Sequence, residues 1–223
     1  MPYKKKILFL FLLFAPIFLG NAVEKTLTVT LKNKTEALIR PVTASPQDKK
    51  ALYTILKDAD TCRSMRDGTP WPDKFIESNY AYYVSSWQIF NDLESLGIKD
   101  HKLTFGFLIF SPNGEVMGLG GIQNSTRNEP YNEIYFEILP PYRNKGLGKH
   151  FGQFLMRFYK SIFGDKILEA IMVQDNQPSK ILLTKLGFKP RLDKQGHPMS
   201  HAFPRWGNRV YDIYRYTPSE NKK

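Results

Sequence analysis

The residues best suited to chemistry form one short run, Arg143-Asn144-Lys145-Gly146-Leu147-Gly148-Lys149. Its two glycines let a ligand approach the backbone closely, and three of its side chains are cationic. A helix that begins in this run would present unpaired N–H groups and the positive end of its dipole, and both attract anions. The run therefore predicts a binding site for a pyrophosphate.

The segments on either side of this run have the periodicities of a strand and of a helix. Before it, in Glu133–Leu139, apolar residues alternate with polar ones, as is typical of a strand. After it, apolar residues recur at helical spacing. These residues are Leu147, Phe151, Phe154, Leu155, Phe158 and Ile162. The pattern predicts a strand, a basic glycine turn and a helix in direct succession.

Spacing excludes two well-known phosphate-binding motifs. A P-loop needs a glycine five positions before the final glycine and a serine or threonine after the lysine, but Arg143 and His150 stand there. A dinucleotide fingerprint needs a third glycine where this chain has Phe151. The pattern that remains is Arg-x-x-Gly-x-Gly.

A second segment also joins a strand to a helix. The apolar stretch Ile167–Val173 is followed by polar residues and by Pro178, which suits the first turn of a helix. Gly187 ends that helix, and Phe188 is placed to fold back on it. Asn176 and Ser179 therefore belong to the start of this second helix.

These segments resemble the GNAT superfamily of N-acetyltransferases. Arg-x-x-Gly-x-Gly resembles its acyl-CoA-binding motif, and Asn176-x-x-Ser179 with the later Lys-x-Gly-Phe resembles its second signature. Two further segments, Leu38–Pro41 and Thr69–Ile76, resemble the subgroup that contains the ribosomal-protein alanine acetyltransferases. The resemblance runs in order over residues 37–217.

The resemblance implies a fold and an activity. The fold is one α/β domain over residues 37–217, with a mixed sheet of six or seven strands and helices on both faces. The strands at Glu133–Leu139 and Ile167–Val173 would splay apart to admit a thioester. The activity is transfer of an acetyl group from acetyl-CoA to a primary amine, by direct attack in a ternary complex. The amine would belong to a protein N-terminus or to a small molecule.

The resemblance also implies which residues hold acetyl-CoA. Amides of Ile138 and Leu139 would hold the pantetheine and the acetyl carbonyl, and the basic run would hold the pyrophosphate. The cofactor-binding residues expected on this basis are Ile138, Leu139, Arg143, Asn144, Lys145, Gly146, Leu147, Gly148, Lys149 and Asn176.

The resemblance also implies which residues are catalytic. Glu133 is the expected base, because related enzymes place a glutamate near the start of this strand, while Glu137 on the same face stays an alternative. Ser179 would donate a hydrogen bond to the departing sulfur, and Asn176 would support the cofactor or the tetrahedral centre. Many family members have a tyrosine where this chain has Leu183. A catalytically lapsed domain that binds CoA or a partner is therefore the second hypothesis.

Composition limits the other functions. The chain has 223 residues, which suits one domain, and a formal net charge of +11. This excess fits an anionic cofactor, a membrane surface or nucleic acid. The positive residues are scattered and no nucleic-acid motif accompanies them, so no nucleic-acid partner is expected. A single cysteine excludes a disulfide within the chain. No metal site is expected at His197 and His201, because Gly196 and Pro198 indicate a loop there and not the helix that such a histidine spacing needs.

The N-terminus has the pattern of a secretory signal. Lys4-Lys5-Lys6 precede an uncharged stretch, Ile7–Leu19, and small residues lead to a cleavage site near Ala22. The stretch is short for a membrane span, yet an uncleaved anchor stays open, with membrane association through residues 7–19. The protein would be cytoplasmic if the leader is not used. Residues 23–36 would form a linker or an edge strand, and residues 218–223 a polar tail.

The remaining elements are expected from periodicity and turn residues. Helices are expected from Ser45 to about residue 58 and over about 73–96, and a hairpin over 103–110 and 115–122 turns at Asn113-Gly114. A long loop over 189–208 would precede a closing strand at 209–216.

Overall fold

The structure is a computed structural model that describes residues 25–95 and 103–218. The predicted leader over residues 1–22 lies outside the described residues, as does the tail beyond residue 218. None of the helices within the two described ranges is both long and apolar enough to cross a bilayer.

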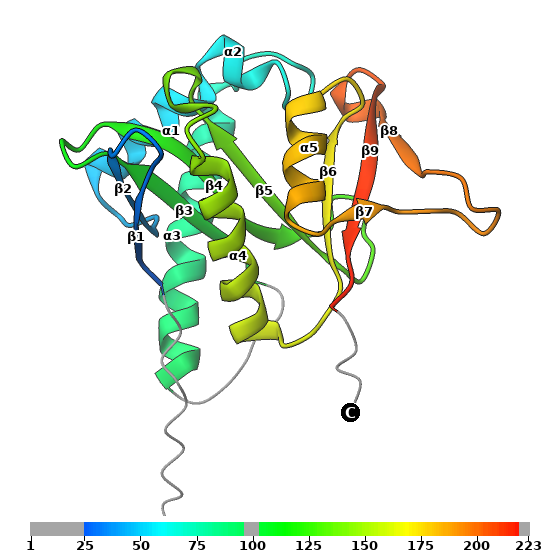
Figure 1. Cartoon of the computed structure of the whole chain (residues 1–223). Coiled ribbons are helices and arrows are strands. Elements are labelled where there is room, and N and C mark those ends of the chain that lie inside the picture. Colours follow the sequence, from blue (N-terminus) through cyan, green and yellow to red (C-terminus); the bar gives the residue numbers. More distant parts are fainter. Residues whose placement is uncertain (1–24, 96–102, 219–223) are drawn as a thin grey trace, which may run out of the picture.

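One sheet runs through the molecule in the order β1-β2-β3-β4-β5-β6-β9-β7, with β8 paired to β9 (Figure 1). The strands are β1 (Leu27–Thr30), β2 (Glu36–Pro41), β3 (Phe105–Phe110), β4 (Val116–Asn124), β5 (Asn132–Ile138), β6 (Leu168–Val173), β7 (Lys189–Pro190), β8 (Ser200–Phe203) and β9 (Arg209–Tyr216). All neighbouring strands are antiparallel except β5 and β6, which are parallel. A mixed sheet of this kind confirms the predicted α/β fold class.

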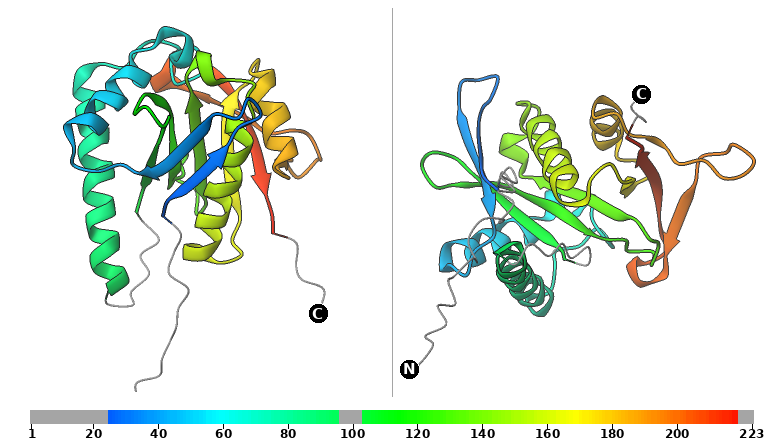
Figure 2. Two further views of the ribbon diagram at one scale, coloured as in Figure 1. Left: turned by 60° about the vertical axis from the view of Figure 1, so that its left-hand side comes forward. Right: turned by 90° about the horizontal axis from the view of Figure 1, so that it is seen from below.

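Helices cover both faces of this sheet (Figure 2). They are α1 (Pro46–Leu56), α2 (Ala59–Cys62), α3 (Asp73–Ser95), α4 (Leu147–Phe163) and α5 (Gln177–Lys185). The apolar stripe of α4 is buried against the sheet, in a core that includes Phe107 and Phe154. A second core forms between the sheet and helices α1 and α3, around Leu52 and Leu108. The two cores explain why β3 is buried along its whole length.

The segment predicted as a loop over residues 189–208 is more regular than its sequence indicates. It contains β7 and β8, and β8 forms a hairpin with β9. The connection turns through Gly207 and Asn208, whose φ angles are 68° and 58°, and the Asn208 amide donates to the Phe203 carbonyl. Together with β1, these short strands bring the sheet to nine strands among the described residues, instead of six or seven.

Glycine in β4 lets α4 approach the sheet closely where the candidate site begins. A Cβ atom at Gly120 would lie 2.5 Å from the ring of Phe151 on α4 and 2.7 Å from the Cβ of Phe136 on β5. No side chain larger than hydrogen fits there unless these neighbours move. The start of α4 is thereby held against the middle of β5.

Candidate active site

The two central parallel strands separate after a short paired stretch. Residues Asn132 and Glu133 of β5 pair with Leu168 and Glu169 of β6, and no later residue of β5 pairs with β6. Both strands nevertheless continue, β5 to Ile138 and β6 to Val173. The strands therefore diverge toward the end of the sheet where α4 and α5 begin (Figure 1).

The backbone of Ile138 faces the gap that this divergence leaves. In an antiparallel pair, successive residues point their N–H and C=O groups to opposite sides. The Leu139 amide donates to the Met117 carbonyl at 3.0 Å, so the groups of Ile138 point away from β4 and toward β6. The Ile138 amide is thus placed to bind a ligand. The expectation for the Leu139 amide is wrong, because continued pairing with β4 already uses it.

The turn between β5 and α4 exposes a set of unpaired amides. Asn144 and Gly146 both adopt left-handed conformations, with φ of 62° and 88°, and Gly146 is the N-cap of α4. Alternating left-handed residues turn neighbouring N–H groups to one side, which creates an anion site. In the described chain, the amides from Lys145 to Gly148 donate to no protein acceptor, whereas the Lys149 amide donates to the Gly146 carbonyl at 3.1 Å. The structure therefore leaves the amides of Lys145, Gly146, Leu147 and Gly148 free to bind an anion, and it uses the amide of Lys149 within the helix.

The side chain of Arg143 points away from these amides. Its Nε donates to the Ile138 carbonyl at 2.8 Å, and its Nη2 lies 3.3 Å from the Thr61 hydroxyl of α2. The separation of β5 from β6 deprives that carbonyl of a strand partner, and the guanidinium supplies one. In this structure Arg143 therefore stabilises the splayed end of β5 and does not face the anion site, contrary to the expectation for its side chain.

Glycine is required at the two positions of the motif for different structural reasons. A Cβ at Gly146 would meet only the side chain of Lys32, at 3.8 Å, so the backbone there is open. A Cβ at Gly148 would lie 2.9 Å from Leu182 of α5, and one at Gly152 only 2.4 Å from Leu186. Gly148 is thus explained by the close packing of α5 on α4, and only Gly146 by open access to the backbone.

The start of α5 brings Asn176 and Ser179 together at the wide end of the gap. The Asn176 side-chain oxygen caps the helix by accepting from the Ser179 amide at 3.2 Å. Within the described residues the Ser179 hydroxyl has no partner, so it is free to donate to a ligand. Leu183, one turn further along, is buried in the core and offers no acid.

Glu133 lies at the paired end of β5, away from the gap. Its carboxylate is buried and accepts from Ser125 and Thr126 at 3.1 and 3.0 Å, and Arg127 lies 3.4 Å from it. Four residues of strand, roughly 13 Å, separate it from the position of Glu137. The expectation that Glu133 is the base is not supported by this placement, because its charge is already neutralised far from the splay.

Glu133 belongs to an ionic cluster that the sequence did not reveal. Glu169, which is fully buried, contacts three arginines: Arg215 at 2.7 Å, Arg191 at 3.3 Å, and Arg127. These residues come from the β4–β5 connection, from β6, and from the segments beside and within β9. The cluster ties β5, β6 and β9 together at the paired end of the gap, so it sets where the two strands begin to diverge.

We expect Glu169→Gln to destabilise the protein by about 3 kcal/mol or more, because it leaves buried arginines without their carboxylate. Asp165→Asn is a matched control, since it removes an exposed ion pair with Lys160 and should change the free energy of unfolding by less than about 1 kcal/mol. Urea denaturation measures both values. Equally small losses in the free energy of unfolding of the two variants would show that the ionic cluster does not hold the strands together.

Glu137, the alternative base, lies at the splayed end of β5. Its side chain is half-buried and accepts no hydrogen bond from the described residues. Burial raises the pKa of Glu137 to about 8, and the nearby Arg143 guanidinium counteracts part of that rise. The carboxyl group can therefore gain or lose a proton near neutral pH.

The neighbours of Glu137 are groups that do not titrate near neutral pH. Cys62 on α2 donates to the Leu56 carbonyl at 3.1 Å, and burial, followed by the charge of Glu137, raises the pKa of this thiol to about 11. Burial likewise raises the pKa of Tyr211 to about 12, and its hydroxyl donates to the Arg66 carbonyl at 2.5 Å. Of these groups, only Glu137 is suited to act as a base at physiological pH.

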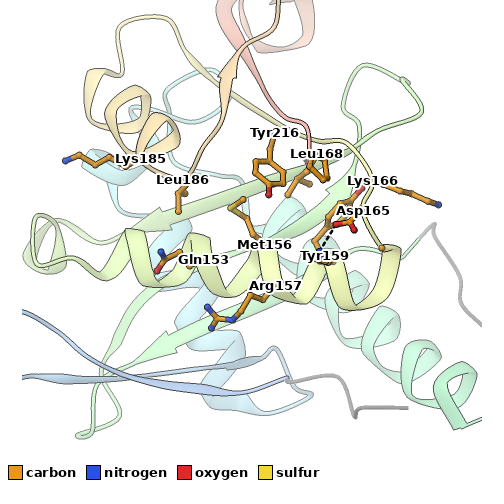
Figure 3. Close-up of a pocket in the computed structure, with 13 residues that line it drawn as sticks. Gln153, Met156, Arg157, Tyr159, Asp165, Lys166, Leu168, Lys185, Leu186 and Tyr216 are labelled. Carbon is orange, nitrogen blue, oxygen red and sulfur yellow. Dashed lines mark ion pairs between the residues drawn. The ribbon is translucent and has the colours of Figure 1, made fainter. Parts of the chain in front are cut away.

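The hollow drawn in Figure 3 lies at the other end of α4. It has a volume of about 420 Å³ and is lined by residues such as Arg157, Lys166 and Tyr216. A second hollow of about 820 Å³ adjoins the β4–β5 connection. Neither includes Ile138, Glu137 or the amides before α4, so neither is the candidate active site.

Splayed parallel strands, a free amide in the gap and an anion site at a helix start together define an acyltransferase of the α/β class. Residues 37–189 match the family described as "Acetyltransferase (GNAT) domain", and the chain belongs to this family. It is an acetyl-CoA-dependent N-acetyltransferase. No curated protein matches the sequence.

Solved structures share the fold at low sequence identity. The ribosomal-protein-S5-alanine acetyltransferase of Vibrio fischeri is 14% identical, with a TM-score of 0.60 over 88% of this chain and 100% of that one. RimJ of Mycobacterium smegmatis, in complex with CoA-disulfide, is 17% identical, with a TM-score of 0.56 over 92% and 91%. Spermidine N-acetyltransferase of Vibrio cholerae, in complex with CoA and spermine, is 11% identical, with a TM-score of 0.54 over 82% and 96%.

Proposed function

We propose that this enzyme acetylates an α-amine, such as a protein N-terminus, with Glu137 as the base. The observation that carries the proposal is the placement of Glu137, a carboxyl group at the splayed end of β5 next to the free Ile138 amide. Burial raises the pKa of this carboxyl group to about 8. An α-ammonium group has a pKa of about 7.7 to 8.0, so Glu137 can accept its proton at almost no cost in free energy.

An amine of higher pKa is a poorer match. A lysine-like ammonium has a pKa of about 10.4, about 2.4 units above that of Glu137, so its deprotonation costs roughly 3 kcal/mol more. Three arginines near this end of the sheet would repel a polycation, although Asp58 and Asp67 also lie near Cys62 and Tyr211. Arg66, Arg143 and Arg209 form no ion pair with a carboxylate in the described part of the chain, and Arg66 instead lies over the ring of Trp71 at 4.9 Å.

The proposed placement of acetyl-CoA follows from the free amides. The amides from Lys145 to Gly148 would bind the pyrophosphate, and the pantetheine would lie between β5 and β6. The Ile138 amide would donate to the acetyl carbonyl and stabilise the oxyanion of the tetrahedral intermediate. Glu137 would take the proton of the amine as the carbon–nitrogen bond forms. The Ser179 hydroxyl would donate to the sulfur as the carbon–sulfur bond breaks.

The second hypothesis, a catalytically lapsed domain, is not favoured. Leu183 does remove the acid that many family members use, but a thiol has a pKa of about 8.5 and is a good leaving group without full protonation. A free Ser179 hydroxyl and a titratable Glu137 retain the groups that the transfer needs.

The acceptor preference can be measured with matched amines at pH 7.5. We expect a peptide with a free N-terminal alanine to have a kcat/KM at least tenfold higher than the same peptide with a blocked N-terminus and an internal lysine, and than spermidine. The expected direction follows from the mismatch in pKa. A preference for lysine or for spermidine would overturn the proposed acceptor class without affecting the acetyl-CoA site.

A further inference from the structure

A lysine outside the segment that matches the family lies against the anion site. The amide of Lys32 donates to the Lys145 carbonyl at 3.4 Å. The Cγ and Cε atoms of Lys32 lie 3.8 and 3.9 Å from the position that a Cβ of Gly146 would occupy. The Lys32 side chain therefore runs along the turn that exposes the free amides, although the family match begins only at residue 37.

The hairpin that carries Lys32 is firmly held in the fold. Strand β1 pairs with β2 along its whole length, from Leu27 opposite Ile39 to Thr30 opposite Glu36. Leu31, directly before Lys32, is buried in the main core and exchanges hydrogen bonds with the far side of the turn. The backbone of Lys32 is thus fixed before any ligand binds, which lowers the entropic cost of using its side chain.

The charges at this point are unbalanced. Lys32, Lys145 and Lys149 surround the start of α4, and none of them forms an ion pair within the described ranges. Cations beside a helix N-terminus are unfavourable, because the dipole there is positive as well. A bound anion would relieve both the mutual repulsion of the lysines and the unpaired state of the amides.

We propose that the Lys32 ammonium binds the pyrophosphate of acetyl-CoA and closes the anion site from the side of the β1–β2 hairpin. This assignment rests on the proposed placement of the pyrophosphate at the amides from Lys145 to Gly148. A charge-assisted hydrogen bond to a phosphate oxygen is among the stronger polar contacts in proteins. Lys32 is therefore a cosubstrate-binding residue supplied by a segment that precedes the matched domain.

The test is calorimetric titration of coenzyme A into the full chain and two variants. Lys32→Gln is expected to weaken binding on the order of tenfold. Lys34→Gln is the matched control, since Lys34 is an exposed lysine of the same hairpin turn, and it should weaken binding less than twofold. If the two variants weaken binding equally, Lys32 contributes only through the overall positive charge of the hairpin, and the proposal is overturned.

Titration of 3′-dephospho-CoA identifies the phosphate. If Lys32 binds the pyrophosphate, the tenfold loss in Lys32→Gln persists with this ligand; if the loss disappears, the lysine binds the 3′-phosphate and the assignment is wrong. Gly146→Glu separates this inference from the proposed site. Should binding survive Gly146→Glu, the placement of the pyrophosphate itself fails, whereas loss in that variant with no effect of Lys32→Gln overturns only the role of Lys32.

Discussion

Glu137→Gln is expected to lower kcat by a factor of about 10² to 10⁴ while leaving the affinity for acetyl-CoA unchanged. Glutamine keeps the size of the side chain but cannot accept the proton of the amine, and positioned bases contribute about this much to rate. Steady-state release of free thiol measures kcat, and calorimetry measures the affinity. A variant with wild-type kcat would remove Glu137 from the mechanism.

The pH dependence provides an independent check on the same residue. With an acceptor amine whose own pKa lies well below that of Glu137, kcat/KM of the wild type should rise about tenfold per pH unit below about 8 and level off above it, because the base must be deprotonated. Glu137→Gln should lack this rise. Glu133→Gln is the control: it should lower stability, because it disturbs the ionic cluster, but keep the pH profile.

Stability should show the opposite trend with pH. Burial raises the pKa of Glu137 from 4.5 to about 8 in the folded protein. Between these values the folded protein retains a proton that the unfolded chain releases, so its contribution to stability is lost as the pH rises toward 8. Glu137→Gln has no such loss. It should be more stable than the wild type at pH 9, and this difference should be absent at pH 4.

Gly146→Glu is expected to abolish acetyl-CoA binding. The substitution places a carboxylate beside the free amides, where it both fills the open space and repels phosphate. A non-glycine residue at a φ of 88° also costs roughly 1 to 2 kcal/mol in stability. In a thermal-shift experiment, millimolar acetyl-CoA should raise the Tm of the wild type and not that of the variant.

Gly196→Glu is the matched control for strain. Gly196 has a φ of 87°, has no atom within 4 Å of an added Cβ, and lies in the turn between β7 and β8. The control should lose a similar amount of stability and keep its response to acetyl-CoA. If both variants still bind, the anion site is not at the start of α4.

Sequence patterns predicted the elements that position the site with good accuracy. The helix whose apolar stripe is expected to start at Leu147 does begin there, and the helix expected near residue 73 begins at Asp73. The apolar stripes explain this agreement, because each helix buries the face that carries its stripe. The strand at Glu133–Leu139 was also correct, because its alternation reflects a face covered by α4.

The choice between Glu133 and Glu137 could not be made from sequence. Both residues lie on the same face of β5, and alternation cannot distinguish the two ends of a strand. Which end is paired with β6 depends on a buried cluster whose members, such as Arg127 and Arg191, are 64 residues apart in the chain. Single charged residues in loops leave no periodic signal, so this cluster and the contact of Lys32 appear only in the folded structure.

The most direct test of the central claim is a crystal structure of the protein with coenzyme A. We expect pyrophosphate oxygens within hydrogen-bond distance of the amides from Lys145 to Gly148. The sulfur should lie between β5 and β6, near the Ile138 amide and the Glu137 carboxyl group. Coenzyme A bound instead in the hollow beside Arg157 and Tyr216, with the start of α4 empty, would contradict the account.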